Sequence, residues 1–187
     1  MNPHKNRAGQ FIRMTLKAIP TPAGFGSLAA TAYWVVVLSG VLLWANPAGA
    51  AELPFKGRID GSLVATPSPD PTIFLGEAHA IGHATHVGAF TKVTSDVINI
   101  ATGEVEGAFT MTAENGDQLK GEYSGFLAFG TTPGTFSWLL DATITGGTGR
   151  FLDATGEFVF IADGDYVLVN GVVNGKYTET FDGTISY

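Results

Sequence analysis

The sequence predicts an all-β fold for residues 51–187, an eight-stranded antiparallel up-and-down β-barrel that follows an N-terminal signal segment. Three observations predict it. Apolar and polar residues alternate with period two through most of this region, which is typical of strands with one buried face. Short segments containing glycine, asparagine or proline separate the alternating runs. No run after residue 51 has the apolar period of a helix.

The alternating runs define about eight strands. Residues 114–117 and 132–134 are predicted turns, and Asp163-Gly164 and Asn174-Gly175 are predicted to be further turns, because Asn-Gly and Asp-Gly supply the positive φ of tight hairpins. Strands joined by short turns are expected to pair in chain order. The expected strands lie near residues 55–65, 72–81, 84–98, 104–113, 118–129, 135–145, 157–173 (one strand or two) and 176–186.

We expect this meander to close into a barrel because its two edge strands would otherwise stay unpaired. A twisted meander of eight strands removes its two unpaired edges by closing on itself. The interior of such a barrel is filled by side chains or is just wide enough for one small ligand. A two-layered sandwich is the alternative architecture for the same pattern.

Residues 1–50 are predicted to be a signal peptide. Four basic residues, all before residue 18, precede an apolar run at residues 28–45, and Ala48-Gly49-Ala50 offers small residues at a cleavage site. Cleavage near Ala50 predicts export to the periplasm or the cell exterior. Because the apolar run is nearly long enough to span a bilayer, a retained membrane anchor is the alternative, and a membrane is an expected partner only in that case.

The remaining chain is strongly acidic and has no cysteine. Residues 51–187 keep six of the ten basic residues and all seventeen acidic ones, which gives a formal charge of −11. Such a surface repels phosphate backbones, so we expect no nucleic-acid partner. An exported domain without disulfides must depend on its core and its hydrogen-bonded strands for stability.

A glycine-rich segment at residues 145–156 reads Thr-Gly-Gly-Thr-Gly-Arg-Phe-Leu-Asp-Ala-Thr-Gly and could hold at most a short helical turn. This pattern resembles the corner shared by plant dirigent proteins and allene oxide cyclases. Residues 76–90 and 180–187 look like bacterial secreted barrels of the allene-oxide-cyclase-like kind. The resemblance implies an eight-stranded barrel, often a homotrimer, whose axial cavity guides the cyclisation (an isomerase reaction) or radical coupling of apolar substrates without a bound cofactor. The catalytic acids of these families match no position in this chain.

Three of the four histidines, His79, His83 and His86, lie close together in the sequence. In an unbroken strand His79 and His83 point to one face and His86 to the other, and a single bulge at Gly82 does not bring His83 and His86 to one face. We therefore expect no metal site here, and no cofactor, and we interpret these histidines as hydrogen-bonded residues at a strand rim.

Carboxylates on apolar stripes are the stronger candidates for chemistry. Glu179 lies on the stripe of Tyr177 and Phe181, and Glu77 and His79 lie on the apolar stripe of the strand near 72–81. If these stripes line the barrel, the three polar residues are the predicted catalytic residues, because burial raises a carboxyl pKa and prepares the group for proton transfer. The alternative for Glu179 is an outward position or an ion pair with Lys176 or Arg150. The predicted ligand-binding residues are aromatic: Tyr123, Trp138, Tyr177 and Phe181.

Two functions fit these predictions. The first is a secreted barrel that binds a small apolar molecule and guides its cyclisation or isomerisation by confining its shape. The second is a non-catalytic exported barrel with a binding or structural role. The interior decides between them, since a solid core excludes the first function and an apolar cavity containing a carboxylate favours it.

Overall fold

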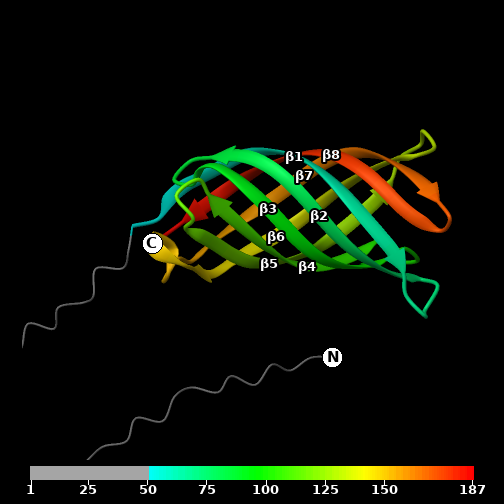
Figure 1. The fold of residues 1–187 in the computed structure, drawn as a ribbon, viewed down its shortest axis with the longest axis horizontal. Helices are drawn as coiled ribbons and strands as arrows, with labels where there is room; N and C mark the ends of the chain where they lie inside the picture. The colour runs from blue at the N-terminus through cyan, green and yellow to red at the C-terminus, as the bar shows by residue number, and fades with distance from the viewer. Residues whose placement is uncertain (1–50) are drawn as a thin grey trace, which may run out of the picture. The chain divides into compact units, whose positions relative to one another are not determined.

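The computed structural model describes residues 51–187, and the predicted signal segment lies outside the described residues. Each strand pairs antiparallel with the next one in the chain, and β8 pairs with β1 (Figure 1). The predicted eight-stranded up-and-down barrel is thus confirmed, and the sandwich is excluded. The elements are β1 (Leu53–Pro67), β2 (Ile73–Ala84), β3 (Gly88–Asn99), β4 (Glu104–Ala113), β5 (Gln118–Phe129), β6 (Thr135–Gly147), η1 (Gly149–Phe151), β7 (Gly156–Val169) and β8 (Val172–Ile185).

The last hairpin differs from the prediction. Asp163-Gly164 lies within β7 and Asn174-Gly175 within β8, while the turn is formed by Asn170-Gly171, at φ values of 52° and 83°. Gly164 and Gly175 are required for close packing instead. A side chain at Gly164 would collide with the ring of Phe136, and one at Gly175 would press against Leu63. A glycine in the sequence can mark either a turn or a position where a neighbouring side chain packs against the backbone, and the sequence alone does not tell which.

The barrel has two different ends. The connections at residues 68–72, 100–103, 130–134 and 170–171 lie at one end, which we call the open end. The turns after β2 and β4, the β6–β7 corner and the C-terminus lie at the other, the closed end (Figure 1). The predicted boundary between β2 and β3 also moves, because their turn is formed by residues 85–87, with His86 at a φ of 67°.

Aromatic side chains fill the half of the interior next to the closed end. Their ring centroids lie 4.8 to 5.8 Å apart, mostly edge to face, which is the favoured geometry of aromatic pairs. Rings of this size fit because inward positions on neighbouring strands are glycines: the Phe181 ring occupies the side-chain space of Gly57, and the Phe109 ring that of Gly121. The rings belong to Phe55, Phe109, Phe158, Phe160 and Phe181.

The glycine-rich corner seals the closed end. Residues 149–151 form a single 3₁₀ turn, where the sequence allowed at most a short helical turn around residues 150–155, and it buries the Phe151 side chain completely. The Arg150 guanidinium donates to the Val87 carbonyl at 3.2 Å and lies 3.9 Å from the Asp117 carboxylate, so the corner is tied to two neighbouring turns. Within residues 51–187, no helix is long and apolar enough to cross a membrane.

Candidate functional site

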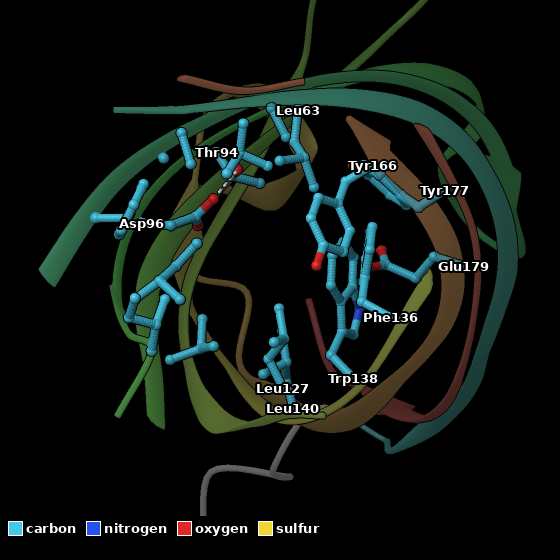
Figure 2. Close-up of a pocket in the computed structure, with 18 of the residues that line it drawn as sticks. Leu63, Thr94, Asp96, Leu127, Phe136, Trp138, Leu140, Tyr166, Tyr177 and Glu179 are labelled. Atoms are coloured by element: carbon cyan, nitrogen blue, oxygen red, sulfur yellow. Dashed lines mark hydrogen bonds between the residues drawn. The ribbon is translucent and has the colours of Figure 1, made fainter. Parts of the chain in front are cut away.

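The half of the barrel next to the open end is hollow. It encloses a cavity of about 270 Å³, about the liquid volume of nine water molecules (Figure 2). The lining residues near the open end are apolar and partly solvent-exposed, with Phe129 at 55% and Leu168 at 63%. The interior is therefore divided along the barrel axis into a packed half and a chamber that opens to solvent.

An aromatic wall runs along one side of this cavity from the mouth inward. Neighbouring rings in the series Phe129, Tyr166, Phe136, Trp138 and Tyr177 have centroids 5.8, 6.3, 5.2 and 4.7 Å apart. Figure 2 shows the inner four of these rings side by side, facing the hollow of the barrel. The wall offers a continuous apolar surface on which a flat or extended ligand can lie.

The inner end of the cavity contains a buried ion pair. Lys92 Nζ, on β3, pairs with Glu179 Oε1, on β8, and the two side chains are 3% and 1% exposed. Trp138 Nε1 donates to the second carboxylate oxygen, Oε2, at 3.0 Å. Burial raises the pKa of Glu179, and Lys92 and Trp138 oppose that rise by stabilising the carboxylate. We call Lys92, Glu179 and the Trp138 N–H the first polar group.

A second polar group lies on the opposite side of the cavity from Glu179 (Figure 2). Asp96 Oδ2 accepts a hydrogen bond from Thr94 Oγ1 at 3.0 Å, and Asp96 Oδ1 accepts one from the Tyr123 hydroxyl. Burial raises the pKa of Asp96, while these two hydrogen bonds oppose the rise. Burial and the neighbouring Asp96 charge raise the pKa of Tyr123, so this phenol stays a hydrogen-bond donor.

The two polar groups exist because β3 reverses the usual pattern. Between the inward Phe90 and Ile98, its inward residues are Lys92, Thr94 and Asp96, and valines at 93 and 97 face outward. On the adjacent strand β2, the residues paired with these three are small, Ala80, Ala78 and Gly76, which leaves room for the β3 side chains. Strand β3 supplies polar side chains and β2 leaves space for them, while β5, β6, β7 and β8 supply the aromatic wall.

This reversal corrects two predicted catalytic residues. Glu77 and His79 lie on the exposed outer face of β2, not in the cavity, so their predicted position inside the barrel is wrong. The larger apolar residues of β2, Leu75 and Ile81, also face outward, at 50% and 67% exposure. The more hydrophobic face of β2 was predicted to point inward, and this is wrong because side chains from other strands occupy the interior beside β2.

The other predicted site residues divide between the two halves of the barrel. Glu179 lies inside, as predicted, but its partner is Lys92 and neither Lys176 nor Arg150. Tyr123, Trp138 and Tyr177 line the cavity, and Phe181 does not, because its ring packs in the closed half against Phe55 and Phe158.

Sequence reasoning missed Lys92, Thr94 and Asp96. The available signal was three polar residues at period two, Lys92, Thr94 and Asp96, but the same pattern describes an ordinary solvent-facing side. Only the small size of the β2 residues paired with them, Ala80, Ala78 and Gly76, distinguishes an inward polar row from a solvent-facing one.

His79, His83 and His86, the histidines among the described residues, do not gather at one place. His79 and His83 are exposed on the outer face of β2, and the His86 ring contacts the Tyr187 hydroxyl at 3.4 Å. Among residues 51–187, no three His, Asp or Glu side chains gather closely enough to hold a metal ion.

No protein-family model matches the chain, and no curated protein matches its sequence. The solved structure of a pterocarpan synthase dirigent protein matches with a TM-score of 0.34 and 13% sequence identity, covering 73% of this chain and 84% of that one. Dirigent proteins are one of the two groups that residues 145–156 resemble. At this TM-score the match adds no argument, and the barrel assignment rests on the strand pairing itself.

Proposed function

We propose that this barrel binds one small, mainly apolar molecule that carries a polar group. The apolar part lies against the aromatic wall, and the polar part meets the first or second polar group at the inner end of the cavity. One observation carries this proposal: an apolar chamber of about 270 Å³ contains two clusters of ionisable side chains, one buried around Glu179 and one partly buried around Asp96. A few convergent polar groups in an apolar pocket are typical of ligand sites.

We further propose that the cavity guides cyclisation or isomerisation of this ligand. Confinement against the wall would hold a flexible substrate near the shape of its product. Glu179 and Asp96 are the groups suited to move a proton, because burial raises the pKa of each carboxyl toward the range where it can both accept and release one. An isomerisation conserves all atoms of the substrate, so it requires neither oxidant nor second substrate.

The alternative is a barrel that binds without turning over its ligand. One observation favours it: each carboxylate already has two hydrogen-bond donors, Lys92 and Trp138 on Glu179, and Tyr123 and Thr94 on Asp96. Fully satisfied polar groups stabilise a fixed arrangement, whereas proton transfer requires one donor to give way to substrate.

A cavity-filling variant tests ligand binding. Ala78 faces the cavity and is buried, so Ala78→Phe should reduce the affinity for naphthalenemethanol by more than about tenfold, or about 1.4 kcal/mol, in titration calorimetry. Ala108→Phe adds the same ring on the exposed outer face of β4 and is the matched control. Equal affinities in both variants would place binding outside the cavity and end the proposal.

Turnover requires the natural ligand. Native mass spectrometry of the chain purified from its own cells reports bound ligand and subunit number together, which also tests the homotrimer. Incubating that ligand with fresh protein and separating the products then detects an isomer of unchanged mass. Binding with no such isomer would favour the non-catalytic alternative. The mass of the mature N-terminus tests export, since a start at Ala51 is expected after cleavage.

A further inference from the structure

Lys92 is an amine held in an apolar chamber. Lys92 is among the residues that line the cavity, its side chain is 3% exposed, and its Nζ lies 3.9 Å from the centre of the Phe160 ring. The other three lysines among residues 51–187, at positions 56, 120 and 176, are exposed on the outer surface. Lys92 therefore differs from them in environment and not only in position.

The ion pair leaves this amine with donor capacity to spare. An ammonium group has three N–H donors. Within the described residues, the structure gives Nζ one hydrogen-bond acceptor, Glu179 Oε1, and two aromatic faces, that of Phe160 and, at 6.0 Å, that of Tyr177. The carboxylate is meanwhile held in place by Trp138 through its other oxygen. An amine beside an immobilised carboxylate, at the inner end of an apolar cavity, is an arrangement suited to carbonyl chemistry.

We propose that Lys92 captures an apolar aldehyde in this cavity as an imine, with Glu179 as proton acceptor and counter-ion. This inference rests on the proposed function, because the carbonyl compound must first enter the cavity. The chemical class it assigns to the ligand is a flat or extended apolar aldehyde, with its carbonyl carbon at the inner end and its apolar part along the aromatic wall.

The step balances without any other reactant. The Lys92 ammonium passes one proton to the Glu179 carboxylate, and the nitrogen lone pair forms a bond to the carbonyl carbon. The carbonyl oxygen takes a proton from that nitrogen and becomes the hydroxyl of a carbinolamine. Glu179 returns its proton to this hydroxyl, the carbon–oxygen bond breaks, and water leaves. Aldehyde and ammonium thus become a protonated imine and water.

The surroundings favour this product for two reasons. The positive charge stays beside the Glu179 carboxylate and above the Phe160 ring before and after the reaction, so no buried charge is left unpaired. Burial also raises the pKa of Glu179, which makes the carboxylate a better acceptor for the first proton. The apolar walls limit the water that would hydrolyse the imine.

Reductive trapping tests the proposal on the full chain. Naphthaldehyde and borohydride should give one covalent adduct, and peptide mass mapping should place it on Lys92 with at least about tenfold preference over the exposed Lys120. Lys92→Arg keeps the positive charge beside Glu179 but cannot form an imine, so it should abolish the adduct while the protein stays folded by circular dichroism. Lys120→Met is the matched control and should leave labelling of Lys92 unchanged.

Naphthalenemethanol separates failure of this inference from failure of the proposed function. If the alcohol binds in the cavity and naphthaldehyde labels Lys92 no faster than Lys120, the imine proposal is overturned and the binding function stands. If neither compound binds, both are overturned. Labelling that persists equally in Lys92→Arg also overturns it, because the adduct then lies elsewhere. Glu179→Gln should slow trapping by about 100-fold or more.

Discussion

Lys92 and Glu179 form an ion pair across the interior of the barrel, although two strands, β1 and β2, separate β3 from β8 around its wall. The pair spans 87 positions in the sequence. On the two strands between them, the β2 residue paired with Lys92 is Ala80 and the β1 residue paired with Ala80 is Gly61, so the residues beside Lys92 are small. The contact therefore depends on closure of the sheet, and on the absence of bulk between its two partners.

Breaking this pair should be costly. Lys92→Met leaves a buried carboxylate without its cation, and we expect a loss of about 3–5 kcal/mol in the free energy of unfolding, measured in urea. The double variant Lys92→Met/Glu179→Leu removes both charges and should recover most of that loss. Lys56→Met breaks an exposed pair with Asp182 and should cost about 1 kcal/mol or less. Similar losses for Lys56→Met and Lys92→Met would contradict the buried position of the Lys92–Glu179 pair.

Asp96 should make the stability of the barrel depend on pH. Its folded-state pKa is raised by burial, so the folded protein holds this proton more tightly than the unfolded chain does. The contribution is fully present below the unfolded pKa of about 3.9 and is lost as pH rises through the folded pKa. Asp96→Asn, which cannot ionise, should therefore melt at a higher temperature than the parent at about pH 8 and at the same temperature below about pH 4.

The control for this series is Asp141→Asn, which removes one negative charge from the exposed face of β6. Its melting temperature should follow that of the parent across the same pH range. A parallel rise in both variants would mean that total negative charge, and not burial of Asp96, sets the pH dependence.

The corner glycine should be less tolerant of substitution than a hairpin glycine. Gly149 and Gly171 both have positive φ, 58° and 83°, so alanine at either costs about 1–2 kcal/mol of backbone strain. A side chain at Gly149 would also collide with the Asp117 carboxylate, whereas nothing lies within 4 Å at Gly171. Gly149→Ala should therefore lower the urea midpoint more than Gly171→Ala, and Asp117→Ala should remove part of the difference. Equal midpoints would show that Asp117 moves aside freely.

The two halves of the interior should respond differently to loss of a ring. Phe160→Ala opens a void in the packed half and should cost about 3–5 kcal/mol of stability. Phe129→Ala, at the mouth, removes a half-exposed ring and should change stability little while weakening the binding of naphthalenemethanol. Melting curves and calorimetry on the same two variants check both statements. The reverse outcome would move the cavity to the closed half.

The barrel could be predicted from sequence because its signal is repeated in every strand. Alternation and short turns specify the order of strands, and the need to cover edges specifies closure. The turns at Asp163-Gly164 and Asn174-Gly175 were wrong for a local reason. Glycine provides positive φ in one place and space for a neighbouring ring in another, and a single sequence does not separate these uses.

The site was less predictable because it depends on pairs of strands. Glu179 was found on its own stripe, where a carboxylate among aromatic residues is conspicuous. Lys92 and Asp96 were missed because an inward polar row looks the same as a solvated one, and Glu77 and His79 were placed inside because Leu75 and Ile81 share their face. The aromatic rings of the opposite strands fill part of the barrel interior. The space that they leave determines which faces of β2 and β3 can point inward.

The seal made by Phe151 and the 3₁₀ turn has a kinetic consequence. With one end closed, a ligand enters and leaves the cavity through the open end only. Under the proposed function, product that has not yet left the cavity would exclude the next substrate molecule and compete with it for the same site. The loops at the open end would then control how fast ligands exchange, although they lie far from the carboxyl groups inside the cavity.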